Sequence, residues 1–450
     1  MVRPNAFGFT TVAAAAVVVH HDRLELSSVT TPHSLESSSN RCPVAHNSPI
    51  APDGPRVPIY TEEFAADPRG GYDRMRGHHR SFAPIELAPG VPATLVIGYQ
   101  AAVGILNDPE HFPADPRTWQ RTVPADSPIL PMLEWRPNAL RNTGPEHARF
   151  RAANVAAIDG VDLHTVHTVV EQIAMPLINS FSAEGHADLL TQYIHPLVSA
   201  NLNTMLGIEP DIAKRVAAGM AAIFDATGDA AAGNRMLAAA LQEHTDRKRA
   251  YPGDDITSRL IAHDSGLDDE EVINQLVSLF GAGIEPQVHL VANALLLMMT
   301  DERFSGSLLG GALTTRDALD WVLFNNPPLV NYCASYPRQP MLVEDVWLPA
   351  HQPVLIGIAA CNNDPQVREG DRNGNRSHLS WGAGPHACPA RQIGYLVAQD
   401  AVDQLLDALP DIELAVPVSE LRWRPGPFHR ALTALPVTFP PSPPLRGVLG

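Results

Sequence analysis

Residues 377–394 read SHLSWGAGPHACPARQIG, and the interpretation of the whole chain starts from this stretch. Cys388 follows a glycine-rich turn at residues 382–385 and precedes Pro389, a residue type favoured at the first position of a helix. We expect Cys388 to cap a helix that carries a buried apolar stripe and ends before Pro410. The positive end of that helix would then stabilise a thiolate.

The turn before the cysteine suits a flat ligand with an acidic edge. Gly382 and Gly384 let the backbone pass beneath such a ligand without a side chain in the way. His386 stands two residues before the sulfur, where its ring can donate a hydrogen bond to an acidic group. A permanent thiolate needs positive potential, hydrogen-bond donors or a metal, and this stretch offers all three.

The pattern W-G-x-G-x-H-x-C-x-A resembles the cysteine loop of the cytochrome P450 family, where F-G-x-G-x-H/R-x-C-x-G is usual. Trp381 replaces the phenylalanine and Ala390 replaces the last glycine. The resemblance implies that Cys388 ligates the iron of haem b. It also places four residues of the loop around the cofactor: Trp381, Gly382, His386 and Ala390.

Other interpretations of the same residues were weighed. A dinucleotide-binding fingerprint can be read at residues 382–387, but no β-branched run precedes it. A zinc site would need a second pair of closely spaced ligands, whereas Cys42, Cys333 and Cys361 are isolated in the sequence. A buried structural role for Cys388 stays open as the simplest alternative.

The composition fits a large domain in a reducing compartment. Length alone would allow about three ordinary domains, but the resemblance implies a single one at residues 58–440, mainly helical with small β-sheets. Hydrophobic residues make up 45% of the chain, and its four cysteines show no disulfide pattern. The formal charge of −17 argues against a nucleic-acid partner. We therefore place the protein in the cytoplasm.

The two ends of the chain are expected to lie outside the domain. Residues 1–57 read as a disordered leader, because serine and proline dominate their second half. The apolar run at residues 12–19 is shorter than the roughly 20 residues that span a bilayer. Only Arg3 precedes this run, so a signal peptide is not favoured either. Residues 441–450 are expected to form a flexible tail.

Two local patterns are expected in the first third of the domain. Residues 85–97 predict a hairpin, with a short helix at residues 99–106. Further on, Thr143 is expected to cap a helix on which His147 and Arg151 share one face. The family resemblance implies that this pair binds the haem propionates. A solvated basic face is the alternative.

A long helix is expected to start at Asp268 and to run through the middle of the molecule for about 32 residues, or about 48 Å. Its midpoint carries the segment where the family has A-G-x-D/E-T. Glu285 keeps the acid, Pro286 replaces the threonine, and the proline leaves the carbonyl of Ala282 without its helical donor. The resemblance implies that these residues handle dioxygen and protons. We hypothesise that proton delivery is either impaired or rerouted through Glu285; a mere kink is the alternative.

A second departure from the family pattern follows. Trp321 and Phe324 stand where the family has the glutamate and arginine of E-x-x-R. Both partners of a buried ion pair have become aromatic together, which avoids stranding one charge. This resembles a subgroup of actinomycete cytochromes P450 that lack E-x-x-R, some of which are encoded beside small GTPase signalling modules. Arg338 lies where the family often has an arginine that reaches a propionate.

The resemblance therefore implies a haem-thiolate monooxygenase that oxidises a small organic molecule, in secondary metabolism, with dioxygen as co-substrate. Electrons would come from ferredoxin and a ferredoxin reductase, since no flavin or iron–sulfur segment is present in the sequence. The alternative is a haem-binding protein without turnover, acting as a sensor within a GTPase-associated signalling complex.

Overall fold

The computed structural model describes residues 54–445, apart from residue 126 and the segments 225–229, 306–312 and 368–374. The predicted leader lies outside the described residues up to residue 53, and the predicted tail lies outside them from residue 446. Within the described part of that tail, Leu445 N donates to Oδ1 of Asn179 at 2.7 Å.

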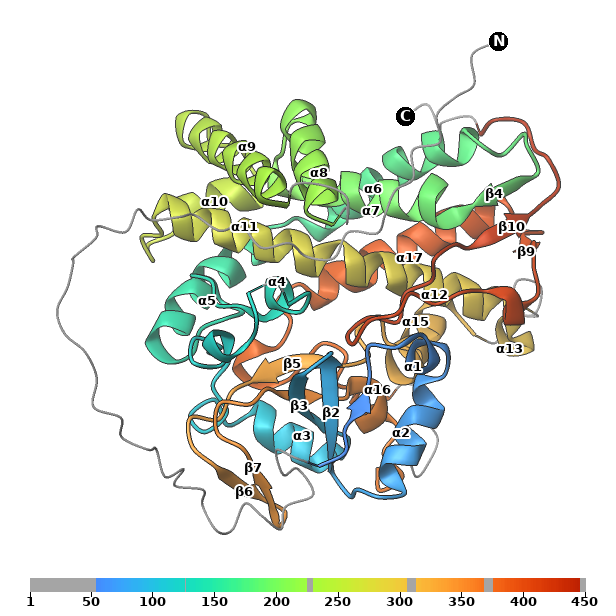
Figure 1. The fold of residues 1–450 in the computed structure, drawn as a ribbon. Helices are drawn as coiled ribbons and strands as arrows, with labels where there is room; N and C mark the ends of the chain where they lie inside the picture. The colour runs from blue at the N-terminus through green and yellow to red at the C-terminus, as the bar shows by residue number, and fades with distance from the viewer. Residues whose placement is uncertain (1–53, 126, 225–229, 306–312, 368–374, 446–450) are drawn as a thin grey trace, which may run out of the picture.

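Helices form the larger part of the molecule, and a small sheet region lies beside them (Figure 1). The first elements are β1 (Val57–Pro58), α1 (Glu62–Ala66), α2 (Pro68–Arg76), β2 (Phe82–Ala88), β3 (Val91–Val96) and α3 (Tyr99–Leu106). Strands β2 and β3 pair antiparallel from Phe82 opposite Val96. The predicted hairpin and the predicted helix after it are both confirmed.

The principal sheet has five strands in the order β1-β2-β3-β8-β5. Its last two members are β5 (Tyr332–Ser335) and β8 (Val354–Ile356). Two smaller sheets are built from β4 (His186–Asp188), β9 (Glu413–Leu414) and β10 (Pro436–Thr438), and from β6 (Met341–Val343) and β7 (Val346–Leu348). The expected fold class, mainly helical with small sheets, is confirmed.

The remaining helices follow in chain order: α4 (Leu130–Leu133), α5 (Gly144–Asp159), α6 (Leu163–Asn179), α7 (His195–Leu206), α8 (Pro210–Phe224), α9 (Ala230–Ala250), α10 (Ile256–Ala262), α11 (Asp269–Gly283), α12 (Glu285–Thr300), α13 (Glu302–Ser305), α15 (Thr315–Asn325), α16 (Ile358–Asn362) and α17 (Arg391–Ala408). Short 3-10 or π turns occur at Trp119–Thr122, Leu190–Ile194, Gly384–His386 and Val418–Glu420. Helix α17 packs between α6 and α12 in the main apolar core.

The long central helix starts as expected and is then interrupted. Asp268 and Glu271 form a reciprocal capping box at the start of α11. The helix breaks at Ile284, whose ψ of −71° departs from helical values, and α12 continues from Glu285 with Pro286 in its first turn. A proline inside a helix lacks the donor for the preceding turn, so the break is where the sequence predicts a kink. The expectation of one continuous helix is corrected accordingly.

Among the described residues, the stretch Asp269–Thr300 is long and apolar enough to cross a membrane by length and composition alone. More than half of its most apolar window, 56%, is buried inside the fold. The core helix of a folded domain meets the same criterion, because a helix that is apolar on all sides is usually buried.

Candidate active site

The glycine-rich turn before Cys388 has the backbone that only glycine adopts readily. Gly382 and Gly384 have φ angles of 69° and 65°, in the left-handed region. A Cβ on Gly384 would lie 2.1 Å from the carbonyl oxygen of Leu106, so α3 closes over the turn. The N–H of Cys388 donates to the carbonyl of Trp381 at 2.7 Å, which fixes the direction of the cysteine.

The helix after the cysteine begins later than expected. Helix α17 starts at Arg391 with Ala390 as its N-cap, so Cys388 and Pro389 lie before the helix and not at its cap and first turn. The helix dipole is strongest within the first turn. Its effect on the sulfur is therefore weaker than the sequence predicted, and local donors have to contribute more.

The electrostatics of Cys388 favour the thiol when the protein is alone. Burial raises the pKa of the thiol, and the backbone N–H of Ala390 and the charges of Arg151 and Arg391 only partly offset this effect. A bound metal cation deprotonates a coordinating thiol outright. Coordination of a metal cation would therefore remove the cost of ionising the buried Cys388 thiol, and its role as an iron ligand stays a prediction.

A group of basic side chains from α5 reaches the cysteine turn. The rings of His147 and His386 stack with their centroids 4.1 Å apart. Arg151, on the same face of α5 as His147, donates a hydrogen bond to the carbonyl of Ala387. Thr143 is the N-cap of α5, although its hydroxyl bonds elsewhere and makes no capping hydrogen bond. The structure therefore brings His147 and Arg151 to the cysteine turn, and the binding of propionates by this pair stays a prediction.

The two histidines are held neutral and lack partners for buried nitrogen atoms. Burial, followed by the positive charges of nearby groups including Arg151 and Arg141, lowers the pKa of His386 to about 3. Burial and then Arg151 also lower the pKa of His147. In the described part of the chain, the Nε2 atoms of both rings are buried without a hydrogen-bond partner. Buried polar atoms of this kind need a ligand or ordered water.

Arg141 is a member of this basic group that the sequence did not single out. It is buried and donates to the carbonyl of Met132 and, at 2.9 Å, to the hydroxyl of Tyr332. Neither partner is an acid. Arg141 lies in a loop before α5, where no periodic pattern marks a residue as directed inward, so only the fold reveals it.

The structure places Arg338 away from this group. Its side chain is 66% exposed and lies 4.0 Å from Asp115. The side chain of Cys333 lies beside the turn instead: a Cβ built on Gly382 would be 3.9 Å from the sulfur of Cys333. Burial raises the pKa of the Cys333 thiol to about 11, so this second sulfur stays protonated. The expectation that Arg338 reaches an acidic edge is not supported by its position.

The cysteine turn and the broken helix pack against each other. Gln287, in the first turn of α12, donates from Nε2 to the carbonyl of Gly394 at 2.9 Å. A Cβ on Gly394 would lie 2.9 Å from the ring of Trp381, so the absence of a side chain allows this approach. The segment that carries Glu285 and Pro286 therefore lies next to the start of α17.

The three residues predicted at the helix break do not point the same way. Ala282 is exposed and Pro286 is half-buried, whereas Glu285 is 1% exposed. The carboxylate of Glu285 accepts a hydrogen bond from Nη2 of Arg424 at 2.6 Å, and Nε2 of His289 lies 3.4 Å away. Burial disfavours the charged carboxylate, but His289 and Arg424 more than offset this and hold the pKa of Glu285 to about 2.

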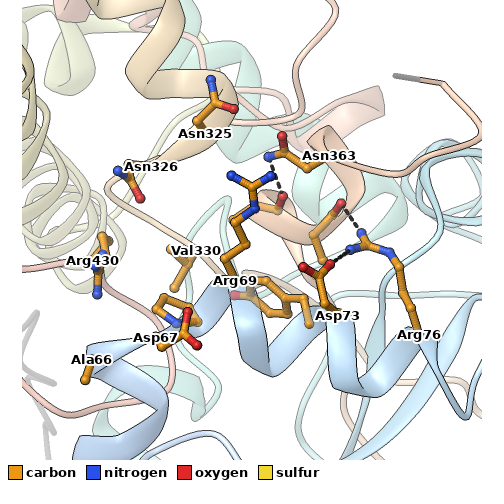
Figure 2. A pocket seen from close by; sticks show the side chains of 14 residues that line it. Ala66, Asp67, Arg69, Asp73, Arg76, Asn325, Asn326, Val330, Asn363 and Arg430 are labelled. Atoms are coloured by element: carbon orange, nitrogen blue, oxygen red, sulfur yellow. Dashed lines mark hydrogen bonds and ion pairs between the residues drawn. The ribbon is translucent and has the colours of Figure 1, made fainter. Parts of the chain in front are cut away.

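A separate small pocket of about 110 Å³ lies between α2 and the ends of α15 and α16 (Figure 2). Two arginines of α2 lie near the end of α16. Arg76 donates to the carbonyl of Ala360 at 2.5 Å, and Arg69 points from α2 toward Asn363 (Figure 2). Cations stabilise helix C-termini. None of the site residues predicted from the sequence lines this pocket.

A mainly helical fold with small sheets, in which a cysteine turn packs against a broken central helix, is that of the P450 class of haem proteins. No family model matches the chain. It is 28% identical over 394 residues to cytochrome P450 monooxygenase PikC of Streptomyces venezuelae, covering 84% of this chain and 92% of the relative. It is 30% identical over 319 residues to mycinamicin IV hydroxylase/epoxidase of Micromonospora griseorubida, covering 66% of this chain and 78% of the relative.

Solved structures show the same fold. Myxobacterial cytochrome P450 CYP267B1, solved with myristic acid, superimposes with a TM-score of 0.75 at 24% identity, covering 85% of this chain and 98% of that one. The chain therefore belongs to the cytochrome P450 family, whose members are haem proteins.

Proposed function

We propose that this chain is a haem-thiolate monooxygenase that oxidises a small organic molecule, and that Cys388 would hold the iron of haem b. The observation that carries the proposal is the position of Cys388 in a glycine turn beside two stacked histidines whose buried nitrogen atoms have no partner. Those nitrogen atoms and the thiol would all gain a partner from one ligand that combines a metal with acidic groups.

The residues present fit this cofactor. His147, His386, Arg151 and Arg141 would hold the two propionates, since none of the hydrogen bonds described for the two arginines goes to a carboxylate. Gly382, Trp381 and Ala390 would line the cofactor near the sulfur. Binding an acidic group beside Arg141 and Arg151 also removes the cost of burying positive charge without a counter-ion.

When bound, a haem with a thiolate ligand supplies the activation of dioxygen for oxygen insertion or oxidative coupling. The chain contributes positioning and protons. Ala282 and Pro286 present a free backbone carbonyl in place of a hydroxyl, so this position accepts hydrogen bonds and donates none. Glu285 is the acid nearest to the break and would pass protons by way of water.

The remaining parts of the proposal concern domain, substrate and partners. Residues 58–440 form the catalytic domain, in the cytoplasm, and the substrate belongs to secondary metabolism, which the name of the mycinamicin hydroxylase supports. Ferredoxin and its reductase would supply electrons. Association with a small GTPase remains a prediction from the sequence.

A carbon monoxide difference spectrum of the purified, haem-loaded protein tests the proposal. We expect the thiolate-type band for the wild type and its loss in Cys388→Ser, while Cys333→Ser, which changes the neighbouring sulfur, keeps it. A thiolate-type band that survives in Cys388→Ser would overturn the assignment of the ligand. Haem affinity should fall in Arg151→Leu and Arg141→Leu, because each variant lacks one of the cations that would face the propionates.

Pro286 favours a second candidate, a haem-binding sensor without turnover, because the helix break offers no hydroxyl donor at this position. Product analysis with surrogate electron donors separates the two functions. Oxidised product supports the monooxygenase, whereas transfer of all the added electrons to dioxygen, giving hydrogen peroxide and no product across a substrate library, supports the sensor.

A further inference from the structure

Two neighbouring cavities meet at Arg430, in the segment that follows α17. The small pocket beside α2 is lined by Ala66, Asn326 and Arg430 among others (Figure 2), and the same three residues line a cleft of about 640 Å³. This cleft lies between α12, Trp321 on α15 and the C-terminal segment at residues 418–423. A volume of this size fits a small organic ligand.

The charged side chains that line the two cavities are unevenly paired. Each of the three aspartates already accepts a hydrogen bond: Asp67 from the N–H of Gly70, Asp73 from Arg76 and Asp301 from Arg303. The arginines of the two linings are Arg69, Arg76, Arg422 and Arg430. Among the described residues, Arg76 is the only one of these four with a carboxylate within 4.0 Å. The cavities therefore hold one cation more than they hold anions, in a chain whose formal charge is −17.

Arg430 is the arginine best placed to hold an anion. Its guanidinium stacks on Trp423, with the central carbon 3.4 Å from the ring centroid, and its Nη1 donates to the carbonyl of Ala65. Nε of Arg430 is buried without a hydrogen-bond partner in the described part of the chain. Burial lowers the pKa of Arg430 to about 10, and the nearby Tyr72 and Asp67 offset this only in part. A stacked guanidinium is held in one plane, and its donors match the two oxygens of a carboxylate.

The larger cleft places apolar side chains next to this cation. Its lining includes the half-buried rings of Trp321 and Trp423 and the side chains of Leu296, Leu297 and Leu421. Aromatic and leucine side chains of this kind suit the ring system of a ligand. Trp321 stands where the E-x-x-R resemblance places the glutamate, so the exchange of that acid for an indole also changes the wall of this cleft.

We propose that the two cavities form one binding site for a small aromatic carboxylate, whose carboxylate pairs with Arg430 and whose ring system lies in the cleft against Trp321. A monoanion is favoured over a dianion, because the arginines exceed the aspartates by a single charge and Asp67 lines the same site. The site goes beyond the proposed monooxygenase function. Among the described residues, none of those that would hold the haem lines either cavity.

The first test is calorimetric titration of the haem-loaded protein with biphenyl-4-carboxylate. We expect saturable binding without a change in haem absorption, and affinity about tenfold or more weaker for the uncharged biphenyl-4-carboxamide. Undetectable binding of the acid would overturn the proposal. A haem shift that follows the same curve as the heat would assign the probe to the haem pocket and overturn it too. Tighter binding of biphenyl-4-yl phosphate would overturn the preference for a monoanion.

Variants test the two halves of the site with matched controls. Arg430→Gln should weaken binding of the acid about tenfold or more, because it removes the charged donor. Trp321→Leu should weaken binding of both the acid and the amide several-fold. The controls are Arg74→Gln on α2 and Trp347→Leu on β7, which line neither cavity and should keep the wild-type affinity. Equal affinities for Arg430→Gln and Arg74→Gln would refute the role of Arg430.

A crystal structure of the haem-loaded wild type with 4′-bromobiphenyl-4-carboxylate locates the probe directly. We expect the anomalous signal of bromine in the cleft between α12 and residues 418–423, with the carboxylate in contact with Arg430. A bromine signal in the haem pocket alone, or a cleft filled by another part of this chain, would overturn the proposal. A signal in the cleft without saturable binding in solution would mean binding at crystal concentration only, which also counts against the site.

The outcomes separate this inference from the proposed function. A normal carbon monoxide band without probe in the cleft overturns the carboxylate site and leaves the haem-thiolate assignment intact. Binding at Arg430 in a protein that lacks the band supports the site and overturns the function. Should Arg430→Gln fail to fold, the bromine position and Arg422→Gln decide the question. Arg422 is an exposed arginine of the same cleft, and its replacement should weaken binding several-fold, whereas unchanged affinity would count against the site.

Discussion

Asp320 on α15 accepts hydrogen bonds from Nε of Arg376 at 3.0 Å and from the hydroxyl of Tyr395 at 2.5 Å. Arg376 lies in the segment that leads to Cys388, and Tyr395 is on α17. Asp320 therefore connects α15 to both sides of the cysteine turn. Asp320 directly precedes Trp321, so an ion pair lies one residue before the position where the E-x-x-R resemblance places the glutamate.

We expect Asp320→Asn to lower the free energy of unfolding by about 2 kcal/mol, since hydrogen bonds to a charged group contribute roughly 1.5–3 kcal/mol. Arg376→Ala should cost less, below about 1 kcal/mol, because exposed ion pairs contribute little and this side chain is 55% exposed. Urea denaturation of the haem-loaded proteins measures both changes.

The control for Asp320 is Asp407→Asn, which removes an exposed carboxylate at the other end of α17 and should leave stability unchanged. Equal losses for Asp320→Asn and Arg376→Ala would mean that the pair acts only through Arg376, contrary to the burial of Asp320.

The backbone of the cysteine turn leads to a second prediction. Gly384→Ala should destabilise the protein by at least about 2 kcal/mol, because strained left-handed backbone costs of order 1–3 kcal/mol and the new Cβ would meet the Leu106 carbonyl at 2.1 Å. Haem retention during gel filtration should fall in parallel. Thermal unfolding and the haem-to-protein absorbance ratio measure the two effects.

Gly104 on the same helix α3 provides the matched control for this change. A Cβ at this exposed position has no heavy atom within 4 Å. Gly104→Ala should stabilise the protein by about 0.5–1 kcal/mol through helix propensity. Stability changes of the same sign for both alanine variants would contradict the steric argument.

Sequence reasoning located the parts of the site that depend on local pattern. The cysteine loop, the His147 and Arg151 pair, the hairpin and the capping box at Asp268 all rest on residues a few positions apart, where spacing alone defines geometry. The helix start at Arg391 was missed for a local reason too. Pro389 is compatible with a first helical turn and with the non-helical turn that the structure contains.

The missed partners come from distant parts of the chain. Arg424 meets Glu285 across 139 positions, and Arg141 meets Tyr332 across 191. No periodicity relates such residues, so the fold must be known before either contact can be inferred. The role of Arg338 stays a prediction from the resemblance: its side chain is 66% exposed and lies 4.0 Å from Asp115.

The burial of Glu285 gives a pH prediction. The pKa of Glu285 is about 2 in the folded protein, below its ordinary value of 4.5, so its ionisation contributes about 3 kcal/mol of stability by linkage. Because the folded pKa is depressed, this contribution is present above about pH 4.5 and is lost as the pH falls toward 2. Removing the cation with Arg424→Met should destabilise the protein by roughly 3–5 kcal/mol at pH 7.

The difference in free energy of unfolding between wild type and Arg424→Met should narrow as the pH is lowered from 7 to 4. The reason is that Glu285 takes up a proton at a higher pH in the variant than in the wild type. His429 acts in the same direction, since the Arg424 charge contributes to its low pKa. Thermal denaturation at several pH values measures the gap. The double variant Glu285→Gln with Arg424→Met should show a smaller deficit that depends less on pH. A difference between wild type and Arg424→Met that widens in acid would contradict the assigned pKa direction.

Pro286 leads to the last prediction, which separates the effect of the backbone from that of a hydroxyl. Pro286→Ala restores the N–H that can reach the carbonyl of Ala282, whereas Pro286→Thr restores the N–H and adds a hydroxyl. Proline in the first turn of α12 is well tolerated, so both variants should keep the free energy of unfolding within about 1 kcal/mol of the wild type. Under the proposed function, Pro286→Thr should lower the peroxide share and raise product yield, while Pro286→Ala should raise the peroxide share by removing the free carbonyl acceptor. Peroxide and product are measured per NADPH consumed with surrogate redox partners. Identical yields in all three proteins would show that proton supply depends on neither the carbonyl nor a hydroxyl at this break, and the role assigned to Pro286 would be abandoned.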